Sequence, residues 1–464
     1  TNVVSSSYYV GNTSRFIYDS VRNKVILIWD EPYPNYRGRY RVGNISGNSI
    51  SWGSVQSIPG LSSLQGNGVM AAYDYPTGKV IITFTATYPM VQAGEPVTSG
   101  YVYTKVGSVS GTSISWGSYI LFASQYSLGI RSDHNYIYEP YTGKILMIYK
   151  SGNNVKSATF TVSTSSNTGT WATNSFVMNM NASSFALTSL RDGRVILTFT
   201  DYTVGGSSGY RQRMKFMNWN TSGNGYFDVG SDITPQSSSP RYNHGPVAWH
   251  NDNGTYTIFA ANGYSSNMYL QVGTLSGSGT TTSISWGSET SPMSSGFNTF
   301  LLDYNSVSKK LLLIGTHSNA LKRREGTYSG TSMTWDSEVT DISSGAPNNF
   351  GQRMAYETLP NGGNKDGKYI IGYKDSGGNN GQGYYYIRQM ASTTRDASRY
   401  IGMAKQSYSN GQTATVNVIG NSTTGSSLTP NSTYYIADDG SITGTETDLS
   451  IGKAYSSTKI LLNR

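Results

Sequence analysis

One pattern of apolar and polar positions recurs along the chain: a short alternating segment, a tight polar turn, and a longer apolar run. It is clearest over residues 16–29 (FIYDSVRNKVILIW) and returns over 71–84 (AAYDYPTGKVIITF) and 136–149 (YIYEPYTGKILMIY). Weaker copies begin near Phe185, Val247, Phe300 and Met354. Short apolar runs bounded by Asn, Gly or Pro are typical of strands, so each copy predicts a β-hairpin.

A second pattern follows later in each repeat and ends on an aromatic residue. It reads SGNSISWGS over 46–54, SGTSISWGS over 110–118, SISWGS over 283–288 and SGTSMTWDS over 329–337. Degenerate versions surround Trp171 and Phe227. The Ser-Gly-Asn and Ser-Gly-Thr turns suit tight hairpins, because Gly accepts a positive φ. A strand precedes each of these turns, so every repeat contains four strands in an up-and-down meander.

Seven copies between Phe16 and Met354 have a mean spacing of about 56 residues, at or slightly above the range of propeller blades. The seventh copy lacks the tryptophan strand, whereas residues 3–10 (VVSSSYYV) precede the first copy without a partner. We therefore predict an all-β, seven-bladed β-propeller in which this N-terminal strand closes the last blade. Closure protects strand edges. The alternative is an open β-solenoid or a pair of sandwiches.

The repeat stops near Arg395, and short alternating strands separated by Gly turns follow it. We predict two domains, a propeller over 1–394 and a small β-rich C-terminal module over 395–464. The Asp438-Asp439-Gly440 sequence resembles a fragment of a calcium loop, but Asp-Gly is more often a plain hairpin turn.

Composition narrows the class of protein further. The chain has no Cys, which excludes disulfides, thiolate zinc sites and Cys nucleophiles. The sequence contains no stretch of 18 apolar residues, so it predicts no membrane-spanning helix. The net charge of +8 is either a modest surface excess or an attraction to an acidic partner such as a polyanionic glycan. No dense basic run or recognition-helix pattern indicates a nucleic acid partner.

The two ends of the predicted blades differ in loop length. The turns within each hairpin are short, whereas the connections over 30–39, 86–100, 123–135 and 234–245 are long and varied. We call the end of the propeller that carries these long connections the long-loop end, and the end that carries the short hairpin turns the short-turn end. Functional residues concentrate on loops held by a rigid scaffold. The candidate binding residues are Arg15, Asp30, Glu31, Tyr33, Tyr36, Arg37, Arg131, His134, Arg241, His244 and Arg353.

Four of these residues, Arg15, Arg131, Arg241 and Arg353, lie at or just before the first strand of a blade. First strands are innermost in a propeller, so the arginines either clamp a carboxylate or phosphate at the channel mouth or pair with nearby Asp and Glu.

The sequence predicts no enzymatic activity, no cofactor and no metal site. Sialidases also use a propeller with an arginine cluster, but the Asp and the following Gly of their repeated Asp-box are missing from the tryptophan strands here. Glu31, Asp133, Glu139 and Glu357 are sources of catalytic carboxylates, yet no spacing brings two of them together. The four His residues show no metal-ligand spacing.

The C-terminal strings YIGMAKQSYSNGQTATVNVIG, LTPNSTYYIADDGSI and IGKAYSSTKILL resemble a module that recurs in tail-fibre and other virion structural proteins of tailed bacteriophages, especially marine ones. The YDYPTGKVIITF and VGSVSGTSISWGS repeats resemble repeats found upstream of that module. The resemblance implies a virion-surface appendage, such as a fibre, knob or receptor-binding protein, and it carries no catalytic residues.

On this interpretation the long-loop end binds a host surface glycan or protein, and the C-terminal module serves oligomerisation or attachment. The expected partners are other virion proteins and further copies of the chain, for example as a trimer. The alternatives are a capsid decoration protein without a receptor, a sialidase-like glycosidase, and a secreted bacterial lectin or surface-filament protein.

Overall fold

The computed structural model has an almost purely β architecture. It describes residues 2–4, 14–19, 21–31, 37–46, 49–61, 69–86, 90–92, 95–97, 101–123, 136–151, 154–179, 182–201, 211–220, 227–234, 247–252, 254–264, 267–293, 300–306, 308–317, 320–342, 353–355, 368–374, 383–389, 403–404, 416–417, 422–424, 427–436, 442–444 and 450–462. Its contacts divide the chain into two compact units, Thr1–Met390 and Ala391–Arg464. The sequence placed this boundary after residue 394. Among the described residues, no helix has both the length and the apolar character needed to cross a membrane.

The described part of the first unit contains eight antiparallel sheets, and seven of them are built on four strands. We number these seven as blades in chain order. Blades 1 to 3 consist of β2 (Ser14–Asp19), β3 (Lys24–Asp30), β4 (Gly38–Ser46) and β5 (Ser49–Trp52); β7 (Val69–Asp74), β8 (Lys79–Ala86), β11 (Tyr101–Ser110) and β12 (Ser113–Trp116); and β14 (Tyr136–Glu139), β15 (Lys144–Ser151), β16 (Asn154–Val162) and β17 (Gly169–Asn179).

Blades 4 to 6 repeat the same order. They consist of β18 (Ala182–Ser189), β19 (Arg194–Asp201), β20 (Arg211–Trp219) and β21 (Phe227–Asp232); β22 (Val247–Asp252), β23 (Thr255–Tyr264), β24 (Asn267–Ser276) and β25 (Ser283–Trp286); and β26 (Phe300–Asn305), β27 (Lys310–His317), β28 (Ala320–Ser329) and β29 (Ser332–Trp335). Three short strands extend the outer edges of blades 1, 2 and 6: β6 (Gln56–Ser57), β13 (Ile120–Ala123) and β30 (Val339–Ile342). A separate hairpin of β9 (Met90–Gln92) and β10 (Glu95–Val97) lies in the long connection of blade 2.

Blade 7 takes its fourth strand from the N-terminus. Its sheet contains β31 (Arg353–Ala355), β32 (Lys368–Lys374), β33 (Gly383–Gln389) and β1 (Asn2–Val4), with Asn2 opposite Tyr384. The predicted pairing of the N-terminal strand with the last blade is therefore confirmed. The two ends of the repeat array share one sheet.

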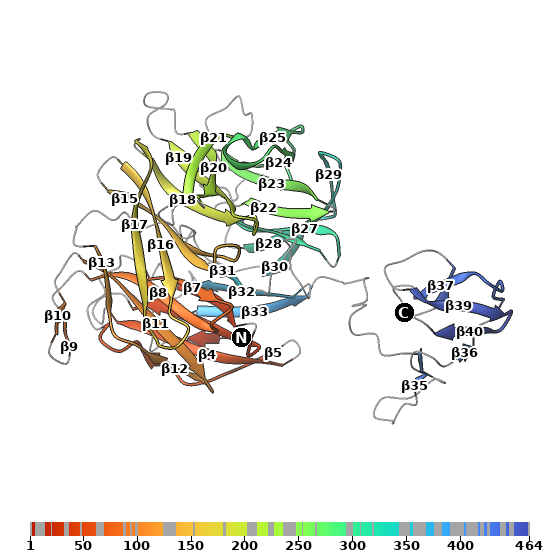
Figure 1. The fold of residues 1–464 in the computed structure, drawn as a ribbon, viewed down its shortest axis with the longest axis horizontal. Helices are drawn as coiled ribbons and strands as arrows, with labels where there is room; N and C mark the ends of the chain where they lie inside the picture. The colour runs from red at the N-terminus through yellow and green to blue at the C-terminus, as the bar shows by residue number, and fades with distance from the viewer. Residues whose placement is uncertain are drawn as a thin grey trace. The chain divides into compact units, whose positions relative to one another are not determined.

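Buried apolar clusters join the blades in a closed cycle. Six of them each link one blade to the next in chain order, and a seventh packs Trp29 and Leu27 of blade 1 on Ile370 of blade 7. Contacts between the first strands of neighbouring blades place these strands at the centre, as Figure 1 shows for the first unit. The prediction of an all-β propeller is confirmed.

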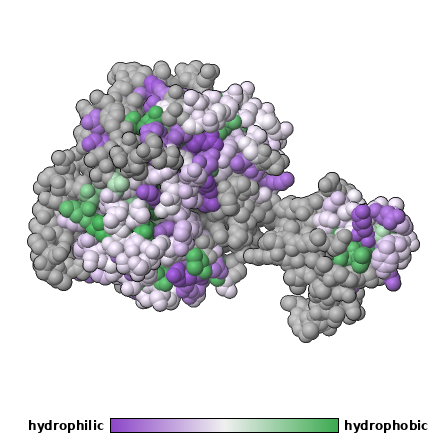
Figure 2. Space-filling view, in the orientation of Figure 1, coloured by the Kyte–Doolittle hydropathy of each residue, from purple (hydrophilic) through white to green (hydrophobic). Residues whose placement is uncertain are grey.

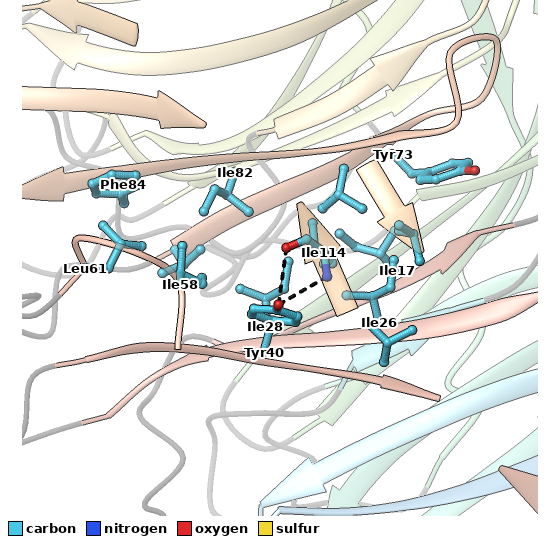
Figure 3. Close-up of a cluster of buried hydrophobic side chains, with 14 of the residues drawn as sticks. Ile17, Ile26, Ile28, Tyr40, Ile58, Leu61, Tyr73, Ile82, Phe84 and Ile114 are labelled. Carbon is cyan, nitrogen blue, oxygen red and sulfur yellow. Dashed lines mark hydrogen bonds between the residues drawn. The ribbon is translucent and has the colours of Figure 1, made fainter. Parts of the chain in front are cut away.

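The junction between blades 1 and 2 shows how the apolar faces are set against each other (Figure 3). Ile26 and Ile28 from β3 pack with Ile82 and Phe84 from β8. Buried Tyr40 crosses this junction, where its hydroxyl accepts a hydrogen bond from Ile114 N (3.1 Å) and lies 3.3 Å from Ile114 O. A directional bond inside an apolar interface fixes the register of one blade on the next.

The recurring tryptophan explains why the third strand of several blades contains glycine. Gly43, Gly107, Gly273 and Gly326 lie directly opposite Trp52, Trp116, Trp286 and Trp335 in the strand register. A Cβ atom on Gly107 would lie 2.4 Å from Ile114 Cγ2 and 2.8 Å from Trp116 Cε3. The indole therefore packs on bare backbone, which only glycine provides.

The second unit contains a five-stranded sheet in the order β36 (Ser422–Thr424), β40 (Lys459–Leu462), β39 (Ser450–Ser456), β37 (Thr433–Ile436) and β38 (Ile442–Thr443). A small ladder joins β34 (Met403–Ala404) to β35 (Val416–Asn417). Leu428, Tyr434, Ile451, Ile460 and Leu462 form its buried cluster with Ala454. The C-terminal residues thus form a β-unit with its own core.

We expect Gly107→Ala to destabilise the propeller, because the added methyl group overpacks the tryptophan contact. Overpacking of a filled interior costs about 1–3 kcal/mol. Denaturant unfolding measures the change, with Ser115→Ala as the control because Ser115 is exposed on the adjacent strand. Equal unfolding midpoints for the two variants would contradict the steric explanation.

Candidate functional site

The long-loop end is the candidate site, and the structure describes part of it. Arg15, Asp30, Glu31 and Arg37 are described with their side chains, and Arg353 is placed as the first residue of β31. The other six candidates lie outside the described residues: Tyr33, Tyr36, Arg131, His134, Arg241 and His244. A convergence of Arg15, Arg131, Arg241 and Arg353 on one anion therefore stays a prediction.

Arg15 is buried on the innermost strand of blade 1. It lies opposite Ile28 in β3 and two residues from Ile17, which packs in the junction with blade 2. Alternate residues of a strand share a face, so Arg15 lies on the blade 2 side of β2. This placement puts its guanidinium stem within a blade junction.

Glu31 is the most unusual described group at this end. It follows β3 directly, its side chain is 1% exposed, and its backbone N donates to Arg37 O at 2.8 Å. Arg39 Nε lies 3.0 Å from Glu31 Oε1, and the guanidinium also contacts Ser57. Within the described residues, neither Oε1 nor Oε2 of Glu31 has a hydrogen-bond partner, so the contact with Arg39 is an ion pair without hydrogen-bond geometry. A buried carboxylate thus lies beside a cation with its hydrogen-bonding capacity unused by those residues.

Asp30, which precedes Glu31 in sequence, and Arg37, whose carbonyl accepts the backbone hydrogen bond of Glu31, differ in exposure. Asp30 ends β3 and is buried, whereas Arg37 is exposed at the point where the chain enters β4. In the described part of the chain, Arg37 makes no ion pair. The site therefore combines a buried acid with a solvent-facing cation a few residues away.

A second blade repeats the acid–arginine pair at the same position. Asp201 ends β19 as Glu31 follows β3, and Arg213 lies opposite Phe199 as Arg39 lies opposite Trp29. Arg213 Nε is 2.9 Å from fully buried Asp201, and its Nη1 is 3.1 Å from Asp232. Here the carboxylate and the arginine are both satisfied, in contrast to Glu31.

Blade 6 neutralises its third-strand cations with outer-strand carboxylates. Arg323 contacts Asp341 and Glu325, each at 2.9 Å, and Lys322 contacts Glu338 at 2.6 Å. These three cation–carboxylate contacts are local to blade 6 and leave the net charge of +8 unchanged. Composition alone did not reveal Arg39, Asp201 or Arg213, but aligning the ends of the second and third strands between repeats would have found them.

Carboxylates at the opposite end of the blades have structural roles. Glu139, a sequence candidate for catalysis, ends β14 at the short-turn end and is fully buried. Its Oε2 accepts from Thr142 N (2.7 Å), and its Oε1 accepts from Ser189 Oγ (3.1 Å) of the next blade. Asp19 accepts in the same way from Arg22 N (3.0 Å) and from the Tyr73 hydroxyl. These groups cap turns and join blades.

A buried lysine lies in the junction between blades 1 and 2. Lys105 is 3% exposed, and its Nζ donates to Pro59 O (3.2 Å) and lies 4.1 Å from the Tyr119 ring centroid. The Tyr119 hydroxyl donates to the same carbonyl at 3.0 Å. Burial lowers the pKa of Lys105 from 10.5 to about 8, because the charged ammonium loses its hydration.

The residues that the structure describes contain no cluster of three or more His, Asp or Glu side chains that could hold a metal ion.

Comparison with known proteins finds similar chains among solved structures. No family model matches the chain, and neither does any curated protein. Among solved structures, the polysaccharide lyase Uly1 matches with 11% identity and a TM-score of 0.49, over 82% of this chain and 90% of that one. The NanB sialidase from Streptococcus pneumoniae matches with 12% identity and a TM-score of 0.40, over 84% and 70%. The leech intramolecular trans-sialidase matches with 9% identity and a TM-score of 0.42, over the same shares of the two chains.

The prediction that this chain is not an enzyme is contradicted by these matches, because the propellers that it resembles are carbohydrate-active enzymes. The missing Asp-box, the unpaired spacing of the carboxylates and the absence of histidine motifs therefore did not exclude an enzyme, because function depends on the residues of a site and not on the fold or on one motif.

The buried lysine predicts a pH dependence of stability. The folded state binds the Lys105 proton more weakly than the unfolded state, so this residue destabilises the fold below about pH 8, and the penalty disappears as the pH rises to 10.5. We expect Lys105→Met to be more stable than the wild type by about 3 kcal/mol near pH 7, with the difference shrinking towards pH 10.

Denaturant unfolding across this pH range measures the effect. Lys309→Met, at an exposed lysine, is the control and should show a difference from the wild type that does not change with pH. A pH-independent effect of Lys105→Met would rule out the buried charge as its cause.

Proposed function

We propose that this protein binds and processes an acidic glycan at the long-loop end of the propeller. The observation that carries the proposal is Glu31, a buried carboxylate that lies beside Arg39 and that accepts no hydrogen bond within the described residues. A group placed in this way is suited to move a proton to or from a bound sugar.

The surrounding residues have distinct parts in this proposal. Arg39 holds Oε1 and so orients the carboxylate, which leaves Oε2 of Glu31 to exchange the proton. Exposed Arg37 attracts a carboxylate or another anionic substituent of the glycan. The net charge of +8 favours encounter with a polyanion.

We further propose that the chain acts on the surface of a virion, where this end of the propeller meets the host. The support is the resemblance of the repeats and the C-terminal strings to tail-fibre and other virion proteins of tailed bacteriophages. On this proposal its partners are other virion proteins, further copies of the chain, and a host surface glycan that is bound and then altered.

The test is turnover of a fluorogenic sialoside and of polysaccharide from host cells. We expect Glu31→Gln to lower the rate about 100-fold or more, since removing a general acid or base costs 10²–10⁴-fold. Glutamine keeps the shape of the side chain, but its amide carries no charge and cannot exchange a proton as the carboxyl group does. Glu325→Gln, which alters a carboxylate paired with Arg323 in blade 6, should leave the rate unchanged.

Thermal unfolding of both variants separates loss of chemistry from loss of fold. Product formation by Glu31→Gln at the wild-type rate would refute the role of Glu31. Absence of turnover by the wild type on every acidic glycan tested would refute the proposal as a whole.

A further inference from the structure

The C-terminal sheet has one face covered by its own core and one face open. β40 alternates, with Ile460 and Leu462 in the buried cluster and Lys459 and Leu461 exposed. In β39 the register with β37 shifts at Ile451, so Ile451 and Ala454 both join the cluster, whereas Lys453 and Tyr455 are exposed. The exposed residues of the two strands therefore lie on the other side of the sheet. In a sheet with one solvated face, these positions are usually polar.

The open side carries two apolar and two basic side chains in a compact arrangement. Lys453 lies opposite Leu461 in the register, and an irregularity between Ala454 and Ser456 sets Tyr455 beside Lys459. Tyr455 is 53% exposed and Leu461 is 47% exposed, and both lysines are exposed as well. We call these four residues, Lys453, Tyr455, Lys459 and Leu461, the β39–β40 face.

This combination is not an ordinary solvated surface. Only six large apolar side chains are strongly exposed among the described residues, and two of them lie on this one hairpin. Neither lysine forms an ion pair or hydrogen bond within the described part of the chain, whereas many propeller cations are paired. Hydrophobic and hydrophilic residues lie side by side on this unit in Figure 2.

We propose that the β39–β40 face binds an acidic polysaccharide. The flat Tyr455 ring offers a stacking surface for a sugar, and Leu461 extends that apolar surface on the adjacent strand. Lys453 and Lys459 lie diagonally across two strands that are about 4.8 Å apart, so both ammonium groups reach anionic substituents of one chain.

Charge argues against a second copy of the chain as the occupant. Two such faces in contact would bring four lysines together, and the β39–β40 face contains no carboxylate among its described residues. A polyanion removes this repulsion, and its attraction to the lysines weakens as salt screens the charges.

The test is affinity electrophoresis of the full chain in gels containing alginate, heparin or neutral dextran. We expect retardation by at least one acidic polymer and none by dextran, with retardation falling as NaCl is raised. The double variant Lys453→Gln/Lys459→Gln should bind at least about tenfold more weakly, which corresponds to 1.4 kcal/mol. Tyr455→Ser/Leu461→Ser should weaken binding with little change in its salt dependence.

The matched control removes two charges from the propeller instead. Lys156→Gln/Lys309→Gln has the same net charge as the lysine variant of the β39–β40 face and should be retarded like the wild type. Equal weakening of both double variants would attribute binding to net charge and overturn the proposal. Absence of retardation by either acidic polymer would overturn it too.

Two further measurements distinguish other occupants. Tighter binding to duplex DNA than to the acidic polysaccharides would replace this assignment with nucleic acid. Dissociation of an oligomer by Tyr455→Ser/Leu461→Ser in sedimentation velocity would identify the face as a contact between copies. Lys453→Gln/Lys459→Gln should turn over the fluorogenic sialoside at the wild-type rate, so failure here and failure of the proposed glycan processing have separate signatures.

Discussion

In blades 1, 2, 5 and 6, the packing of a fourth-strand tryptophan on a third-strand glycine is the constraint on which the blade structure depends. Because Gly107 has no side chain, Trp116 lies flat against the backbone of its neighbour and covers the outer part of the blade. The residue after the tryptophan then reaches the next blade: a Cβ on Gly53 would lie 2.5 Å from Thr112 Cβ. One repeated contact therefore sets both the spacing within a blade and the approach of the following blade.

Closure of the cycle determines where chemistry can occur. The flat faces of the blades are buried by apolar packing against neighbouring blades, including the cluster that joins Trp29 to Ile370 across the two ends of the array. Carboxylates at the short-turn end, such as Glu139, are fully used in capping turns and bridging blades. The long-loop end differs, because Glu31 there accepts no hydrogen bond from any described residue, and an exposed arginine, Arg37, lies a few residues away.

The two units of the chain offer different kinds of surface for a glycan. The candidate group of the propeller is a single buried acid suited to proton transfer. The C-terminal sheet carries one exposed ring, Tyr455, and two exposed lysines that form no ion pair within the described residues, which are suited to holding a polyanion without chemistry. A protein that retains a polymer on one unit and acts on it with another gains effective concentration of its substrate.

The sequence alone determined the strand order, the repeat, and the supply of the last blade's fourth strand by the N-terminus, because period-2 alternation and turn residues are local properties. It also identified Asp30, Glu31 and Arg37 as loop-end candidates. It could not assign Arg39 or Arg213 as partners of buried carboxylates, since those pairs form only when the second and third strands align in register. It likewise could not show that Tyr455 and Leu461 share an open face, because burial of the alternate residues depends on how the small sheet packs. Local pattern fixes which strands form, whereas pairing and burial, which decide the chemistry, arise only from tertiary contacts.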